Sequence, residues 1–220
     1  MGNPTVTPLV ENRREGGYVI WDPSDGMLTR EAIVLLSGVG VCIAGIVLGA
    51  VLTNGAATTA PIGTNDGNGT FGAITVSGAA RLGDFTVEFN SATQFVVNDP
   101  TGALVGHGKT GTAFTGSGLG FTITAGGTAF SPGDSFRITA TGTLKYAPYD
   151  PTASDGRQNA AAILWSGYRD ATAADRRAVA NVRGPMRVNA GELLWGANVT
   201  TPQQQTSALA QLAKLGILNT

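Results

Sequence analysis

The side chains that could perform chemistry in this chain of 220 residues are few and widely spaced. Five carboxylates of its middle part lie mostly in turn sequences, where Asp commonly caps backbone amides. They are Asp66, Asp84, Glu88, Asp99 and Asp134. Their spacing indicates no pair for acid–base catalysis. We therefore predict no catalytic residue and no enzymatic activity.

Metal and cofactor chemistry has equally little support. The chain has one histidine, His107, which lies between two glycines and is predicted to sit in a surface turn. Its one cysteine, Cys42, has no partner for an internal disulfide, and a single His with a single Cys does not form a conventional zinc site. The glycines do not form a phosphate-binding loop. We predict no metal and no cofactor, and a binding or structural role.

Composition excludes a nucleic-acid partner and indicates β structure. The formal net charge is -1 and Lys and Arg are not clustered, whereas nucleic-acid binding requires a basic surface. The 32 glycines, together with many Thr, Val and Ala, are typical of short strands joined by tight turns.

The N-terminal residues 1–17 are predicted to be an arm. Two prolines remove backbone donors, and Arg, Glu and Gly residues keep the segment solvated. One interpretation is a disordered terminus. The other is an arm that orders on a partner by pairing with an exposed strand edge. Thr5-Val6-Thr7 and Leu9-Val10 could pair with that edge. The candidate binding residues of the arm as a whole are Pro4, Thr5, Val6, Thr7, Pro8, Leu9 and Val10.

The apolar run at residues 32–52 has two interpretations. It contains no charged residue and is long enough to cross a bilayer as a helix. It is also rich in β-branched residues and interrupted by Gly38, Gly40, Gly45 and Gly49, which favours strands buried on both faces. In that case Gly38 and Gly40 form the turn between two strands.

The rest of the chain changes character twice. Residues 53–68 have the composition of a linker, and residues 69–142 contain six or seven short segments that predict a β-sandwich or small barrel. Residues 170–177 predict a short helix or turn, and residues 192–195 a strand. The last segment predicts a helix with Thr201 as N-cap, Pro202 at its first position and Gln204 completing a capping box. Gly216 is its stop signal.

Motifs at both flanks carry a family resemblance. Asn3-Pro4-Thr5, Thr29-Arg30-Glu31 and Val47-Leu48-Gly49 occur in order in the first fifty residues. Near the other end follow Tyr149-Asp150-Pro151 and the sequence DATAAD at residues 170–175, then Leu193-Leu194-Trp195. In order and spacing the chain resembles the head decoration proteins of tailed bacteriophages, of the lambda D-protein type. Residues 69–142 form a large insertion relative to the minimal family domain.

The resemblance implies both a fold and a function. The fold is mainly β (α+β): a small mixed β decoration domain, β-tulip-like with a C-terminal helix, interrupted by an inserted β-sandwich-like domain. The function is that of a structural virion protein, made in the host cytoplasm, which binds the outside of an icosahedral head as a homotrimer at three-fold positions. Its partner is the major capsid protein, and it stabilises the expanded capsid against DNA pressure.

The implied domain bounds are residues 1–17 for the capsid-binding arm, 18–60 plus 143–220 for the decoration and trimerisation domain, and 61–142 for the inserted domain. The decoration-domain core or trimer interface is expected at Trp21, Val47, Leu48, Trp165, Trp195 and Leu212. The alternative is a membrane-anchored surface protein that crosses the bilayer once, at residues 32–52, and displays a β adhesin or carbohydrate-binding domain.

Overall fold

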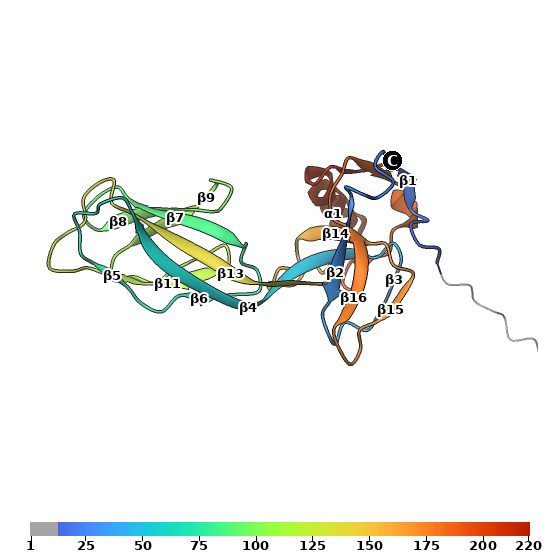
Figure 1. The fold of residues 1–220 in the computed structure, drawn as a ribbon, viewed down its shortest axis with the longest axis horizontal. Helices are drawn as coiled ribbons and strands as arrows, with labels where there is room; N and C mark the ends of the chain where they lie inside the picture. Colours follow the sequence, from blue (N-terminus) through green and yellow to red (C-terminus); the bar gives the residue numbers. More distant parts are fainter. Residues whose placement is uncertain (1–12) are drawn as a thin grey trace, which may run out of the picture. The chain divides into compact units, whose positions relative to one another are not determined.

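A computed structural model describes residues 13–220, and Figure 1 shows the arrangement of its strands and single α-helix. The chain forms two compact units. Unit 1 contains the described residues up to Gly49, together with Tyr146–Pro151 and Asn159–Thr220, and unit 2 contains Ala50–Lys145 and Thr152–Gln158. All eight Phe lie in unit 2, whereas the three Trp and four Tyr lie in unit 1. Each unit therefore has its own core.

Unit 1 is built on a closed ring of five strands. In order around the ring they are β2 (Arg30–Leu35), β16 (Arg176–Asn181), β14 (Ala160–Leu164), the beginning of β4 (Val47–Ile62) and the end of β13 (Ser135–Pro148). The ring closes where Tyr146 of β13 pairs with Leu35 of β2 and the Leu36 N–H donates to the Tyr146 carbonyl at 2.9 Å. Closure leaves this small sheet without a free edge.

A β-bulge in β14 lets this strand serve two cores. The register with β4 shifts between Ala160 and Ala162. Ala162 packs in a cluster with Leu48 and Leu164, and Ala160 packs in a second cluster with Val47 and Leu212. The bulge also places the Ala160 N–H within 2.6 Å of the Gln211 side-chain oxygen on the helix. Both faces of β14 are therefore buried, which a strand this apolar requires.

The helix and a three-stranded sheet belong to the second cluster. Helix α1 (Pro202–Lys214) has the predicted N-cap, N1 proline and capping box, and Gly216 follows with φ +81°, so these predictions are confirmed. The small sheet has the order β1 (Val19–Trp21), β17 (Met186–Val188), β18 (Ile217–Asn219). The strand predicted at residues 192–195 is wrong: a 3-10 helix (Ala190–Glu192) and one isolated bridge from Leu194 occupy this region.

The apolar run forms strands, so the membrane-helix interpretation of residues 32–52 is wrong. The run supplies most of β2, then β3 (Val41–Ile43) and the start of β4. Gly38 and Gly40 have φ values of +86° and +79° and lie in the predicted turn. Within residues 13–220 we find no helix with the length and apolarity needed to span a bilayer. The run is apolar because β4 is buried on both faces at Val47 and Leu48.

The linker predicted at residues 53–68 is also wrong over its first ten residues. Strand β4 continues without interruption from Val47 to Ile62 and pairs with β13. The Thr53 hydroxyl donates to the Thr143 carbonyl at 3.0 Å, and the Thr141 hydroxyl donates to the Ala56 carbonyl. Pairing with a long neighbour makes this Thr- and Ala-rich segment a strand although its composition is typical of a linker.

Unit 2 consists of two layers around a phenylalanine-rich core. One layer extends β4 and β13 with β7 (Gly83–Phe89), β8 (Gln94–Asn98) and β9 (Leu104–Lys109). The other has the sheet β10 (Phe114–Gly116), β11 (Leu119–Phe121), β6 (Thr75–Val76), and the pair β5 (Thr70–Phe71) and β12 (Ile123–Thr124). Phe85, Val87 and Phe89 alternate inward as predicted. His107 lies in β9, so its predicted place in a turn is wrong.

Residues 170–177, predicted as a short helix or turn, include the end of one strand, the start of the next and the residues between them. Strand β15 (Tyr168–Asp170) pairs with β3, and β16 begins at Arg176. Turn geometry is limited to the residues between them, where Asp170 accepts a hydrogen bond from the Thr172 N–H at 2.9 Å.

One buried carboxylate organises a loop region of unit 2. Asp134 is 5% exposed and accepts hydrogen bonds from the N–H groups of Asp66 (3.0 Å), Gly67 (2.9 Å) and Ser131 (3.0 Å). Burial raises the pKa of Asp134, but these backbone donors outweigh it, and the pKa lies below its ordinary value. The carboxylate therefore joins residues 66–67 to the start of β13.

Replacing Asp134 by Ala should lower the free energy of unfolding by about 3 kcal/mol, because three buried N–H groups lose their acceptor. Urea titrations should show the loss by circular dichroism. Tryptophan fluorescence should show less of it, because every Trp lies in unit 1. Because the pKa of Asp134 is lowered by folding, its carboxylate contributes stability above about pH 4, and this contribution is lost as the pH falls through the pKa of the folded protein. The difference in the free energy of unfolding between Asp134→Ala and the parent protein should therefore become smaller at acidic pH. Asp66→Ala, which keeps the Asp66 N–H, is the control, and equal losses in both variants would contradict the assignment.

Candidate functional site

The first described residues of the N-terminal segment are fixed against the indole of Trp165. Gly16 has φ +67°, and a Cβ atom at this position would lie 2.1 Å from the Trp165 ring, so only glycine fits. Before it in the chain, Arg13 forms an ion pair with Glu192, and the Gly167 N–H donates to the Glu15 carboxylate at 2.9 Å. Residues 13–17 of the predicted arm therefore form an anchored root.

The guanidinium of Arg30 also contacts the Trp165 ring. Its Cζ atom lies 3.3 Å from the ring centroid, the geometry of a cation–π interaction. Gly26 makes room for this group, because a Cβ atom there would lie 2.2 Å from Arg30 Cζ. Asp22 supplies the counter-charge at 4.0 Å. Arg30 thereby joins the turn that contains Asp22 and Gly26 to Trp165, the residue that holds Gly16.

Asp22 is itself held by its own turn. Its carboxylate accepts hydrogen bonds from the Ser24 N–H (3.0 Å) and the Thr29 hydroxyl (2.6 Å). Burial raises the pKa of Asp22, but the hydrogen bonds from Thr29 and Ser24 outweigh it, and the pKa is lower than the ordinary value. The group is therefore ionised at neutral pH and stabilises the Arg30 cation.

A buried polar network lies beneath this turn. The Tyr18 hydroxyl donates to the Asn181 side-chain oxygen at 2.5 Å, and the Asn181 amide donates to the Thr29 hydroxyl at 3.3 Å. All three residues are at most 2% exposed. Burial raises the pKa of Tyr18, so the phenol stays protonated and available as a donor. Through Asn181, the network joins the end of β16 to the residues that directly precede β1 and β2.

An apolar face lies on the three-stranded sheet that follows the root. Trp21 pairs in register with Arg187 of β17, which pairs with Leu218 of β18. Residues in register share a face, and Trp21 and Leu218 are 51% and 45% exposed. A register shift between Val19 and Trp21 leaves Ile20 exposed as well. We call Ile20, Trp21, Arg187 and Leu218 the β1–β17–β18 face.

The six residues predicted for the core or an interface occupy different environments. Val47, Leu48 and Leu212 are fully buried. Trp195 is half-buried and packs against the cluster around α1, and Trp165 is half-buried under Arg30. Trp21 is half exposed. The predicted arm contacts from Pro4 to Val10 lie outside the described residues.

Sequence reasoning missed the residues that surround Trp165. Arg30 enters the sequence pattern only as part of the Thr29-Arg30-Glu31 motif, and Gly16 only as part of the predicted arm. The available signal was the glycines: Gly16 and Gly26 flank β1 at positions with a positive φ and a close neighbouring side chain. The partner of Gly16, Trp165, is distant in sequence, so the signal did not identify this contact.

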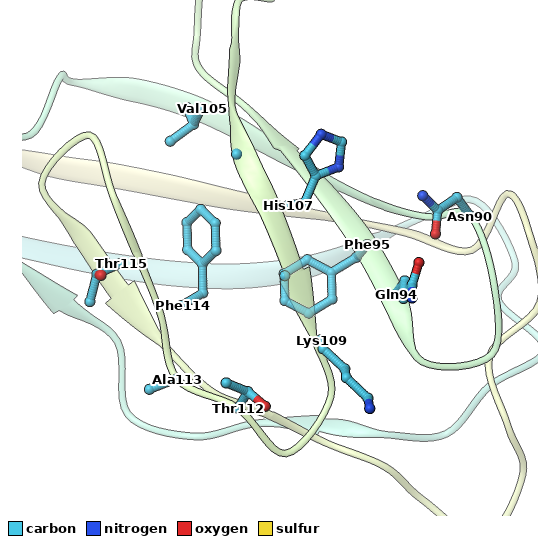
Figure 2. Close-up of a pocket in the computed structure, with 12 residues that line it drawn as sticks. Asn90, Gln94, Phe95, Val105, His107, Lys109, Thr112, Ala113, Phe114 and Thr115 are labelled. Atoms are coloured by element: carbon cyan, nitrogen blue, oxygen red, sulfur yellow. The ribbon is translucent and has the colours of Figure 1, made fainter.

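Unit 2 has a separate concave site of about 590 Å³. It is lined by β9 and by residues 112–115, with Gln94 and Phe95 from β8 and Asn90 from the turn before it. Figure 2 shows the side chains of His107 and Lys109 on β9 beside the rings of Phe95 and Phe114. No carboxylate lines the site.

Neither region has the composition of a metal centre. Among the residues from Arg13 onward, no three His, Cys, Asp or Glu side chains lie close enough together to hold a metal ion. Cys42 is a buried thiol whose pKa is raised by burial to about 11.

Comparison with protein families finds one match. The family model described as Bacteriophage lambda head decoration protein D matches residues 94–217, which is more than half of the chain. The matched range runs from β8 of unit 2 to the start of β18 in unit 1. It includes residues 94–142, which the motif resemblance did not cover, and leaves out residues 1–93. A search of curated proteins finds no similar sequence.

Among solved structures, similar chains include flagellar proteins, and the structural likeness is low. FlgL from Xanthomonas campestris is 26% identical, with a TM-score of 0.33, over 47% of this chain and 34% of that one. The hook junction protein FlgK from Burkholderia pseudomallei is 18% identical, with a TM-score of 0.33, over 58% of this chain and 23% of that one. The chain thus spans about a third or less of the length of these proteins.

The contact between Gly16 and Trp165 can be tested with a matched pair of glycine variants. Gly16→Ala should release the root, because Cβ overlaps the indole, and should speed trypsin cleavage after Arg13 and Arg14 by about tenfold. Gly38→Ala is the control, since Gly38 also has a positive φ but no atom lies within 4 Å of its added Cβ. It should cost about 1 kcal/mol of stability without changing this cleavage. Equal cleavage rates in the two variants would contradict the anchored root.

Proposed function

The chain belongs to the bacteriophage lambda head decoration protein D family, and we propose that it binds the outside of an icosahedral phage head as a homotrimer at three-fold positions. Its location is the outer surface of the virion capsid, and its role is structural rather than catalytic. There it would stabilise the expanded capsid against the pressure of packaged DNA. The observation that carries the proposal is the family match over residues 94–217.

The proposed partner is the major capsid protein, contacted by the arm residues from Pro4 to Val10. The anchored root supports this assignment. An arm whose root is held at Gly16 loses less entropy on binding than one whose tether is mobile. In a trimer, three arms act together, and linked contacts can exceed the affinity of one by 10²–10⁴. Dissociation then requires all three arms to detach.

The proposal assigns the β1–β17–β18 face to contacts between protomers. An exposed Trp beside an Arg and two aliphatic side chains has the composition typical of interface centres, where aromatic residues and Arg are enriched. The face follows the root directly in the chain, so trimer formation would bring the three roots to defined positions. Trp21 would then be buried by a neighbouring protomer.

Removing residues 1–12 should leave a folded trimer that no longer binds expanded heads. The deletion spares Arg13 and Gly16, which hold the root on unit 1. Binding is measured by co-sedimentation with heads that lack the decoration protein, and the oligomeric state by sedimentation equilibrium. A chain in which Gly and Ser replace residues 1–12 at equal length is the control for bulk. Full occupancy by either variant would rule out the arm as the binding element.

Unit 2 is proposed to be an outward β module that trimer formation does not need. The Thr53 hydroxyl bonds the Thr143 carbonyl, so residues 54–142 can be replaced by a two-residue Asn-Gly turn between adjacent antiparallel strands. The shortened chain should remain a trimer and still bind heads. Tryptophan fluorescence reports whether unit 1 is folded, because all three Trp lie there. A folded but monomeric product would contradict this division of labour.

A further inference from the structure

Strand β9 is the last strand of its sheet and has one free edge. In the described part of the chain it pairs with β8 on one side and with no strand on the other. Natural proteins usually protect such an edge, because its unpaired backbone groups can bind another strand. The segment after β9 covers this edge only in part: the Thr112 N–H donates to the Lys109 carbonyl at 3.1 Å, and the chain then enters the other layer as β10.

The register identifies which backbone groups point out of this edge. The Thr110 N–H donates to the Thr93 carbonyl at 2.9 Å, which makes these two residues a hydrogen-bonded pair. In an antiparallel ladder such pairs alternate, so Gly106 and Gly108 bond β8. The N–H and C=O groups of His107 and the N–H of Lys109 therefore point away from β8, whereas Val105 lies at a register shift where the alternation is interrupted.

These groups border the concave site of unit 2. The site is lined by residues 105–109 on one side and residues 112–115 on the other (Figure 2). Phe95 and Phe114 fill the space that side chains at Gly108 and Gly106 would need, so β9 lies flat against the core. A backbone approaching the edge meets no side chain from either glycine.

The titratable side chains that line the site are His107 and Lys109, and none of the lining residues is acidic. Lys109 forms no ion pair within residues 13–220, and neither it nor His107 has a carboxylate beside it among the lining residues. Asn90, Gln94, Thr112 and Thr115 supply neutral polar groups. An anionic occupant would therefore gain attraction without displacing an existing partner.

We propose that the free edge of β9 binds an extended, acidic polypeptide segment of another protein by β-augmentation. The backbone groups of His107 and the N–H of Lys109 would form ladder bonds with the segment, and the Lys109 ammonium would pair with an acidic side chain. This activity belongs to unit 2 and goes beyond head binding by unit 1. It would allow a decorated head to hold a second protein on its outer surface.

The test uses the full-length, ¹⁵N-labelled protein and two capped peptides, acetyl-Thr-Glu-Val-Glu-Thr-amide and acetyl-Thr-Lys-Val-Lys-Thr-amide. The acidic peptide should shift the amide signals of His107 and Lys109 and slow hydrogen exchange at both. The amides of Gly106 and Gly108 bond β8 and should change little. The basic peptide should bind more weakly, because it meets Lys109.

Two pairs of variants separate backbone from side-chain recognition. His107→Pro removes the outward N–H without removing a bond to β8 and should weaken binding by about fivefold, whereas His107→Ala keeps the N–H and most of the affinity. Lys109→Glu should weaken the acidic peptide by about two- to fivefold and strengthen the basic one. This exchange of preference does not depend on the proline variant being folded.

Several outcomes would overturn the proposal. One is the absence of amide shifts at about 1 mM acidic peptide. Others are equal responses to both peptides, or equal losses for His107→Pro and His107→Ala. Self-association of the protein through β9, seen by sedimentation, would identify a second copy as the occupant instead. Stronger shifts of the same amides by sialyllactose than by the acidic peptide would identify an acidic sugar.

Discussion

The N-terminal segment of unit 1 is held in place by contacts with the indole of Trp165. The indole meets the backbone at Gly16 and the guanidinium of Arg30, and Arg30 in turn packs on Gly26. Two segments near the N-terminus are thereby joined to a ring more than 130 residues later in the chain. A cation–π contact contributes about 0.5–2 kcal/mol depending on how far it is removed from water, and the Arg30 side chain is 25% exposed. The glycines let the chain approach the ring and the cation without a Cβ atom. The contacts of Trp165 hold the root on unit 1 and so determine the position from which the proposed arm starts.

A second constraint is that β14 and β4 are each buried on both faces. The bulge between Ala160 and Ala162 turns one side of β14 toward the ring interior and the other toward α1. Gln211 satisfies the N–H that the bulge releases. Such strands must be apolar throughout, which accounts for the run that resembles a membrane helix in the sequence. The same run makes unit 1 a compact support for a decoration protein.

The parts of the fold that follow from local chemistry could be predicted from the sequence. The capping box at Thr201 and Gln204 needs only residues three apart, and the inward alternation from Phe85 needs only one strand. The continuation of β4 beyond Thr53 could not be predicted, because it depends on pairing with β13 more than eighty residues later. The stack on Trp165 was missed for the same reason. Free strand edges such as that of β9 become visible only when the register of the whole sheet is known.

These features describe a protein with a rigid, anchored unit that carries an arm, and a second unit that can present a binding edge. The most direct test of this account is cryo-electron microscopy of expanded phage heads incubated with the full-length chain. The account predicts added density at the three-fold positions, with three copies whose unit 1 contacts the shell and whose unit 2 does not. Added density in which unit 2 forms the contact with the shell, or heads without added density, would contradict it.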